Sequence, residues 1–332
     1  MIMKEIHEKI KAKGQNVNKF FLLIFLLVIG FDAIAQGKYL VIDSTDTGYA
    51  TKHYRLNTRE LYDTDFNIET FNIIFSEKNN SSKNLNQYER ILLVSLLPDI
   101  STGKLWEEID AKDIKEHTIG PAEYVRSISP VLGFKNNVFD LKKFNQTRLV
   151  TEEKGKWWVS SNCLIESFEI VPNGLPFFSG IYGQLILDQN MVAIKEFVEK
   201  YPPEEYKDVL GIPLLLSGRG GRADNLNGWR TWKEFLSKIV SVNGSGKGYQ
   251  FWTCAATNVA DNYDASQGVG RFIYVPGEGI IGGSYDFYFL RPPSYYLAKS
   301  GNKIYSHRLT SEQWDKNILE EKVMIAESFT ID

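Results

Sequence analysis

Residues 91–97 are the stretch of this sequence that most restricts its fold. They are apolar except for Ser95, and Pro98 ends the run. Such a stretch has no polar face to turn toward solvent, so it is either a helix buried in the core or a central strand covered on both faces. Its periodicity does not separate these two structures. In either case, other segments have to cover it from all sides.

The first 35 residues have the pattern of a secretory signal peptide. Five lysines between residues 4 and 19 precede an uncharged apolar run over residues 20–31, and Ala33 and Ala35 are small residues of the kind that precede a cleavage site. The run is shorter than the roughly 20 residues that cross a bilayer as a helix, so an uncleaved anchor is the weaker alternative. We therefore expect cleavage before Gln36 and export to the periplasm, the cell surface or the medium, with no membrane span after the leader is removed.

The composition predicts a folded protein and excludes some partners. The chain is 43% hydrophobic and 13% aromatic, which is enough apolar surface to offset the entropy of ordering the chain. It has 38 basic and 41 acidic residues and no long basic block, and this argues against nucleic-acid binding. We also expect no cofactor: Gly218, Gly220 and Ala223 fit a loose Gly-x-Gly-x-x-Ala dinucleotide pattern, but Pro213 shortens the strand before it and the predicted helix starts several residues too late.

The two cysteines, Cys163 and Cys254, leave two structures open. They do not form a Cys-x-x-Cys pair, so thiol redox catalysis and a thiolate zinc site are not indicated. In an oxidising compartment they are a possible disulfide. The alternative is two buried thiols in neighbouring strands.

The pattern of apolar residues predicts an α+β fold with a largely antiparallel sheet and packed amphipathic helices. We divide the mature chain into a mixed α/β N-terminal region, residues 36–150, and an aromatic- and glycine-rich α+β region, residues 151–332. The predicted helices cover residues 104–117, 190–201, 229–240 and 311–317. The predicted strands cover residues 38–43, 71–75, 249–255, 271–275, 285–290 and 322–330, with two more between residues 156 and 171.

A glycine-rich loop at residues 217–222 is a candidate ligand-binding site. It follows a short apolar run and precedes the predicted helix at residue 229. Backbone N–H groups at Gly220 and Gly221 and the guanidinium groups of Arg219 and Arg222 are suited to bind a phosphate, sulfate or carboxylate. The spacing of a nucleotide-binding loop is absent, and a surface loop with solvated arginines is the alternative.

A polar loop at residues 261–268 is a weak calcium candidate. Asp261 and Asp264 are closely spaced oxygen ligands followed by glycine, but the loop departs from the EF-hand pattern. A turn between two strands rich in Asn, Asp and Gly needs no metal.

Aromatic residues are frequent after residue 151, and in an exported protein exposed aromatic faces can stack on sugar rings. Two acidic residues near these aromatics, Glu278 and Asp286, are candidate catalytic carboxylates for glycosidic hydrolysis. The first function hypothesis is therefore non-catalytic binding of a glycan or an anionic small molecule. The alternatives are a secreted carboxylate-dependent hydrolase and a structural or partner-binding envelope protein.

Overall fold

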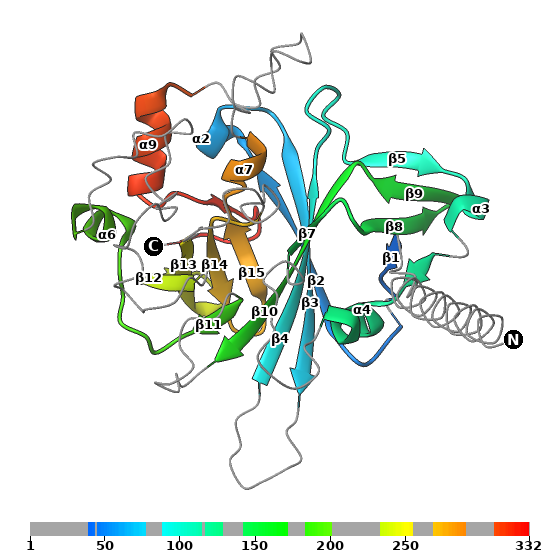
Figure 1. Ribbon diagram of the computed structural model, residues 1–332, viewed down its shortest axis with the longest axis horizontal. Helices are drawn as coiled ribbons and strands as arrows, with labels where there is room; N and C mark the ends of the chain where they lie inside the picture. The colour runs from blue at the N-terminus through cyan, green and yellow to red at the C-terminus, as the bar shows by residue number, and fades with distance from the viewer. Residues whose placement is uncertain are drawn as a thin grey trace, which may run out of the picture.

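The computed structural model describes residues 39–43, 45–77, 88–114, 117–128, 142–171, 183–200, 233–254, 268–289 and 309–331. Strands make up 50% and helices 18% of these residues, and the strands form three sheets. We call these sheets A, B and C and describe the strands of each below. Figure 1 shows sheet B in the centre, with sheet C on its left and sheet A on its right. The predicted α+β class with packed amphipathic helices is therefore wrong, because sheets rather than helices cover both faces of the central sheet.

Sheet B is the centre of the fold. Its strands run in the order β11-β10-β4-β3-β2, with β7 also paired to β10, and all pairs are antiparallel except β10 with β11. They are β2 (Ala50–Asn57), β3 (Asn67–Glu77), β4 (Tyr88–Leu97), β7 (Lys142–Phe144), β10 (Asn162–Val171) and β11 (Gln184–Ile186). Along β4, Leu93 and Leu97 face one core while Leu92 and Leu96 face another. The apolar run at residues 91–97 is thus a central strand buried on both faces.

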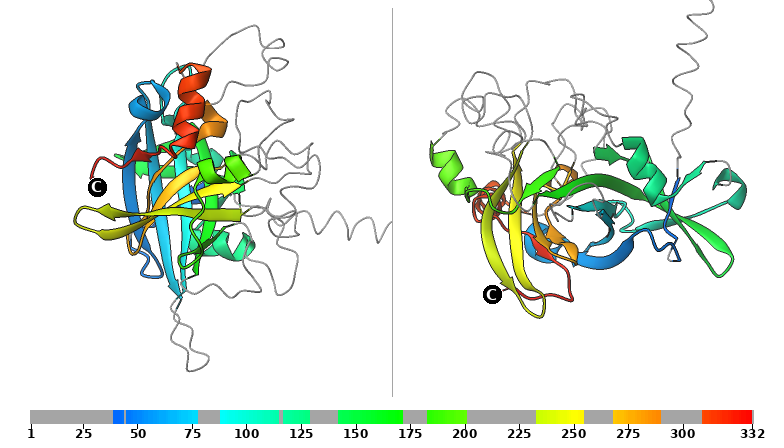
Figure 2. Two further views of the ribbon diagram at one scale, coloured as in Figure 1. Left: turned by 90° about the vertical axis from the view of Figure 1, so that its left-hand side faces the viewer. Right: turned by 90° about the horizontal axis from the view of Figure 1, so that it is seen from below.

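Sheet C is an antiparallel meander that packs on one face of sheet B. Its strands follow one another in sequence: β12 (Lys233–Val242), β13 (Gly246–Cys254), β14 (Arg271–Val275), β15 (Gly279–Gly283) and β16 (Met324–Ile325). The hairpin of β12 and β13 extends to one side of the molecule (Figure 2).

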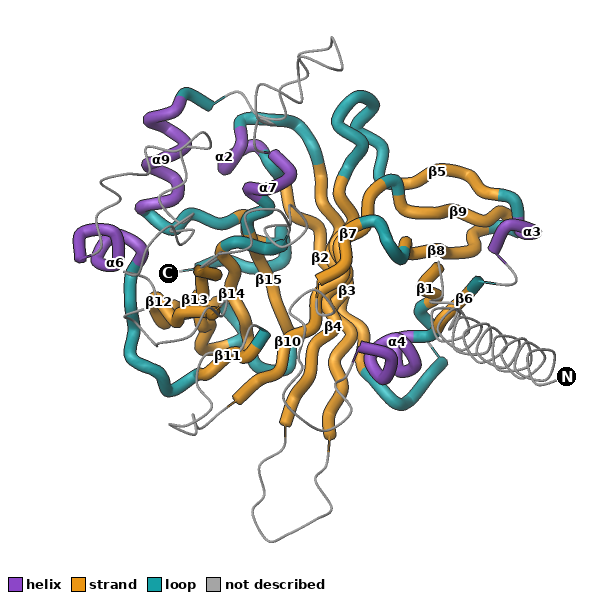
Figure 3. Tube along the Cα trace, in the orientation of Figure 1, coloured by secondary structure: helices purple, strands orange, loops and turns teal. Residues whose placement is uncertain are grey.

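Six short helices occur among the described residues, at the rims of the sheets (Figure 3). They are α2 (Arg59–Tyr62), α3 (Ala111–Ile114), α4 (Pro121–Ile128), α6 (Ile194–Lys200), α7 (Asp286–Phe289) and α9 (Ser311–Leu319). The start of α9 is fixed by a capping box between Thr310 and Gln313, which satisfies backbone N–H groups of the first turn.

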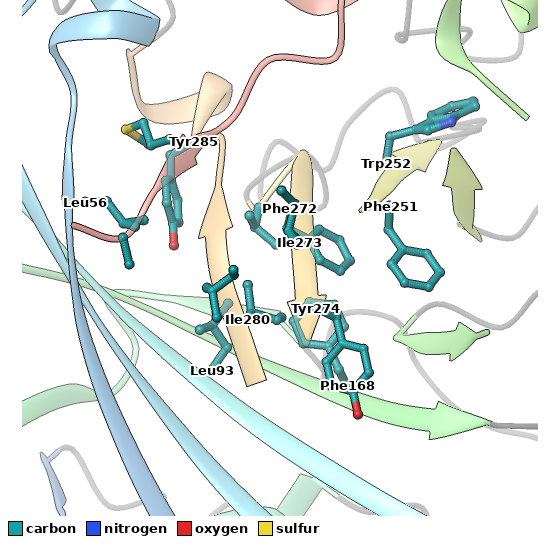
Figure 4. Packing of buried hydrophobic residues seen from close by; sticks show 14 of the residues in the cluster. Leu56, Leu93, Phe168, Phe251, Trp252, Phe272, Ile273, Tyr274, Ile280 and Tyr285 are labelled. Atoms are coloured by element: carbon teal, nitrogen blue, oxygen red, sulfur yellow. The ribbon is translucent and has the colours of Figure 1, made fainter. Parts of the chain in front are cut away.

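The largest core lies between sheets B and C. Figure 4 shows side chains of this core: Leu93 and Phe168 from sheet B belong to the same cluster as Phe272 and Ile280 from sheet C. Aromatic rings fill much of this layer; the rings of Phe168 and Phe272, for example, have centroids 5.2 Å apart. Because both sheets contribute side chains to this layer, neither can bury its inner face without the other.

Sheet A packs on the opposite face of sheet B. Its order is β5-β9-β8-β1-β6, with parallel pairs only around β1. The strands are β1 (Tyr39–Val41), β5 (Trp106–Ile109), β6 (Thr118–Ile119), β8 (Arg148–Glu153) and β9 (Lys156–Ser160). Leu40 and Leu149 from sheet A meet Leu92 and Cys163 from sheet B in a second core. Sheets A and B each take strands from both sides of the predicted region boundary near residue 150.

Residues 324–331, here called the C-terminal segment, contact one edge strand of sheet B and one edge strand of sheet C. Met324 and Ile325 pair with β15, Ala326 forms a bridge with Leu56 of β2, and Ile331 forms one with Val242 of β12. The segment therefore covers part of the open edges of β2 and β12, which would otherwise present unpaired backbone groups.

Several predicted elements agree with the structure. The predicted strand at residues 271–275 is β14, residues 71–75 lie within β3, and the two strands around Cys163 are β9 and β10. The helix near residues 311–317 is α9, and the helix at residues 190–201 is present as the shorter α6.

The helix predicted at residues 229–240 is wrong where the structure describes it, because residues 233–242 form β12. A register shift between Leu236 and Lys238 bends this strand. The bulge interrupts the two-residue alternation of side chains, so the apolar residues recur at intervals that resemble a helix.

Three more predicted elements are wrong for reasons of tertiary pairing. In the predicted helix at residues 104–117, residues 106–109 are drawn into a strand by pairing with β9, and only α3 is helical. In the predicted strand at residues 285–290, the chain leaves sheet C after Gly283 and forms α7. Of the last strand, predicted at residues 322–330, only β16 is present. The residues after it form bridges to the edge strands β2 and β12.

Candidate functional site

A cluster of aromatic and charged side chains lies where Trp106 of β5, an edge strand of sheet A, contacts Glu69 of β3 in sheet B. In the pairing of β2 with β3, His53 lies opposite Phe71 and Arg55 lies opposite Glu69, so these four side chains share one face. The rings of His53 and Phe71 stack with centroids 4.3 Å apart and an angle of 4° between their planes. Together with Trp106 of β5, these residues are called the Glu69 cluster.

The carboxylate of Glu69 is the polar centre of this cluster. His53 Nε2 lies 3.5 Å from Glu69 Oε2, and Arg55 Nη2 lies 3.5 Å from Glu69 Oε1. Hydrogen bonding from His53 lowers the pKa of Glu69, and smaller contributions from Trp106 and Arg55 act in the same direction against partial burial. Glu69 is therefore an ionised hydrogen-bond acceptor at neutral pH.

The cluster is open to solvent on one side. The His53 and Arg55 side chains are 48% and 55% exposed, whereas Glu69 is 12% exposed. Phe71 and Trp106 are partly exposed and pack against the core between sheets A and B. Ring faces beside an ionised acceptor and two cationic or donor groups can recognise a molecule that has both apolar faces and hydroxyl groups.

The two predicted catalytic carboxylates are not brought together. Glu278 precedes β15 and Asp286 follows it, and the four steps along this five-residue strand alone span about 13 Å at about 3.3 Å per residue. A pair of glycosidase carboxylates needs a separation of about 5 to 10 Å.

Each of these carboxylates has its own partners. Glu278 accepts a hydrogen bond from the Tyr54 hydroxyl at 2.8 Å and pairs with Lys52 Nζ at 3.0 Å. Partial burial acts to raise the pKa of Glu278, but the hydrogen bonds from Tyr54 and Lys52 lower it overall. Asp286 is held by both terminal nitrogens of Arg271, at 2.6 and 3.2 Å. Both side chains thus connect segments of the fold.

The other predicted ligand sites lie outside the described residues. These are the glycine-rich loop with Arg219, Gly220, Gly221 and Arg222, and the calcium candidates Asp261 and Asp264. Within the described ranges, no group of three or more His, Cys, Asp or Glu side chains is placed to hold a metal ion.

Cys163 is a free thiol in the structure and is fully buried between sheets A and B. The possible disulfide to Cys254 is therefore not formed here; Cys254 ends β13 in sheet C, and its side chain is not described. For Cys163, the buried-thiol alternative agrees with the structure.

Cys163 is expected to resist alkylation in the folded protein. Burial raises the pKa of its thiol to about 12, so only about one molecule in ten thousand carries the reactive thiolate at pH 8. Mass spectrometry of the Cys163 peptide after iodoacetamide treatment should show modification only when urea is present. Rapid labelling of the native protein would contradict the buried position.

The Glu69 cluster has only a weak signal in the sequence. His53 and Arg55 are exposed and alternate with buried residues along β2, which is a weak sign of a strand with one open face. Their partners, however, come from two other strands. The sequence pattern places Trp106 in a helix with its side chain pointing inward. The pairing of β2 with β3 brings four members of the cluster together, and the hydrogen bond between Trp106 and Glu69 adds the fifth.

No protein-family model matches this chain, and no curated protein or solved structure is significantly similar to it. No helix in the described part of the chain is long and apolar enough to cross a bilayer.

Proposed function

We propose that the protein is exported and binds a glycan without catalysis, through the Glu69 cluster. The supporting observation is the carboxylate of Glu69, 3.5 Å from nitrogens of His53 and Arg55 and beside the partly exposed side chains of Phe71 and Trp106. A sugar ring offers C–H groups to an aromatic face and hydroxyl groups to a carboxylate and a guanidinium group, so both parts of the cluster would be used at once. The leader pattern at residues 1–35 supports the export part of the proposal.

Binding without catalysis fits the site better than the hydrolase alternative. A retaining or inverting glycosidase needs two carboxyl groups on opposite sides of one bond. The cluster contains one carboxylate, and donors that lower its pKa make it a poor general acid at neutral pH. The predicted pair, Glu278 and Asp286, is divided between the two ends of β15.

Replacing Trp106 with alanine is expected to weaken glycan binding at least tenfold. The substitution removes a ring face and a hydrogen bond to Glu69, and a loss of about 1.4 kcal/mol corresponds to tenfold in the dissociation constant. Residues 36–332 would first be applied to a glycan array, and hits would be measured by isothermal titration calorimetry. Glu69→Gln should weaken binding as well, because it removes the charge.

Trp157→Phe is the matched control. Trp157 is on the same sheet as Trp106 but packs on the opposite face, against Val150 and Val159. This variant should bind glycan as the unchanged protein does. The proposal is wrong if no glycan binds, or if Trp106→Ala binds as tightly as Trp157→Phe while both melt within a few degrees of the unchanged protein.

Anion binding by Arg219 and Arg222 stays a prediction of the sequence. The double variant Arg219→Ala with Arg222→Ala, measured against sulfate, phosphate and uronic acids in the same titrations, would test it independently of the Glu69 cluster.

A further inference from the structure

The face of sheet A that carries Trp106 also carries a second tryptophan. In the pairing of β5 with β9, Trp106 lies opposite Ser160 and Glu108 lies opposite Trp158. Directly paired residues share a face, and so do residues two apart on one strand, so Trp106 and Trp158 are diagonal neighbours. Trp157 has the opposite orientation and packs in the third core.

In the described part of the chain, Trp157 packs against a hydrophobic core, whereas Trp158 does not. It is partly exposed, and it belongs to none of the three hydrophobic core clusters formed by the described residues. Its direct neighbours across the sheet are the exposed residues Glu108 and Thr151. A large ring with polar neighbours and no core contact is suited to contact a ligand.

The geometry points to a linear glycan that runs from the Glu69 cluster along sheet A to Trp158, with at least two consecutive sugar rings bound. This inference rests on the proposed function. Diagonal neighbours across a sheet have side chains about 7 to 8 Å apart, so two indole rings in these positions offer separate faces to separate sugar rings. A single sugar ring stacked on Trp106 would leave Trp158 without a ligand contact.

The charges along this path favour a neutral glycan over an acidic one. Arg55 is paired with Glu69, and Lys156 Nζ lies 3.0 Å from Glu108 Oε1. Because each of these cations already has a carboxylate partner, the path has no surplus of positive charge for a uronic acid or a sulfated sugar. Hydroxyl groups can instead bind to the carboxylate oxygens and N–H groups of these pairs.

The test is the dependence of affinity on chain length. Xylose, mannose, glucose and N-acetylglucosamine oligomers of one to six rings would be titrated into residues 36–332. For the series that binds, we expect the dissociation constant to fall at least tenfold between the disaccharide and the tetrasaccharide. Trp158→Ala should remove this gain while leaving the affinity for the disaccharide within about twofold, and Trp157→Phe should keep the gain. Oligogalacturonate should bind more weakly than the neutral series.

The outcomes separate this inference from the proposed function. If a glycan binds through Trp106 but its affinity does not rise with chain length, or if Trp158→Ala keeps the gain, the extended path is wrong and glycan binding stands. Tighter binding of oligogalacturonate would overturn the preference for a neutral chain. If no oligomer binds at all, both the proposed function and the inference fail.

Discussion

Replacing Arg271 with alanine is expected to lower the free energy of unfolding by about 3 to 5 kcal/mol. Arg271 is only 1% exposed and donates two hydrogen bonds to Asp286, while its Nε donates to the Lys322 carbonyl at 3.0 Å. The substitution would leave the Asp286 carboxylate buried without its cation. Urea denaturation followed by circular dichroism would measure the loss.

Asp286 also accepts a hydrogen bond from the Tyr62 hydroxyl at 2.8 Å, and that hydroxyl accepts one from the Tyr285 N–H at 2.7 Å. Desolvation, together with the charge of Asp286, raises the pKa of Tyr62 well above its usual value, so Tyr62 stays neutral and remains a donor. The network therefore links α2 in the N-terminal half to α7 and β14, and its loss should affect the whole molecule rather than one loop.

The matched control is Arg59→Ala. Arg59 pairs with Asp65 on the surface, where the two side chains are 70% and 67% exposed, and such pairs contribute no more than about 1 kcal/mol. The double variant Arg271→Leu with Asp286→Leu should regain part of the loss, because it removes the unpaired charge. If Arg271→Ala costs no more than Arg59→Ala, the buried pair does not stabilise the fold as described.

Replacing Asn72 with alanine is expected to cost about 2 to 5 kcal/mol. Asn72 is fully buried in β3, and its amide makes two hydrogen bonds to one residue of sheet C: Nδ2 donates to the Ile280 carbonyl at 3.0 Å, and Oδ1 accepts from the Ile280 N–H at 2.7 Å. Alanine would leave both backbone groups without a partner, at about 1 to 3 kcal/mol each.

The neighbouring glycine supports this interpretation. Gly279 has a φ of +83°, and a Cβ atom there would overlap with the Asn72 side chain. The control for Asn72→Ala is Asn57→Ala, since the Asn57 side chain makes only exposed hydrogen bonds among the described residues, donating to Asn67 at 3.3 Å and accepting from the Arg59 N–H at 2.9 Å, and its loss should cost no more than about 1 kcal/mol. Equal melting temperatures for the two variants would show that the Asn72 contact does not hold sheets B and C together.

The sequence predicted strands well where burial is uniform or alternates regularly. Residues 271–275 are all buried in β14, and their β-branched and aromatic content was sufficient. The pattern of residues 91–97 fits a helix or a strand, because both structures bury such a run, and only pairing with β3 and β10 on either side decides for the strand.

The failures occurred where distant contacts override the local pattern. In β12, a bulge after Leu236 produced helix-like spacing in a strand. At residues 286–289, the ion pair with Arg271 holds the chain in a helical turn that β-propensity did not indicate. The Glu69 cluster depends on the same kind of information, since β2 and β3 belong to one sheet and β5, which supplies Trp106, belongs to another.

The contacts of the C-terminal segment also restrict when the molecule can assemble. On a ribosome, β2 is synthesised early, whereas residues 324–331, which bridge its edge and that of β12, emerge much later. An incomplete chain consequently keeps two strand edges unprotected during synthesis, and the full set of edge contacts can form only after translation has passed residue 331. Chains halted before residue 324 lack these edge contacts, so they should be more sensitive to protease than the complete chain.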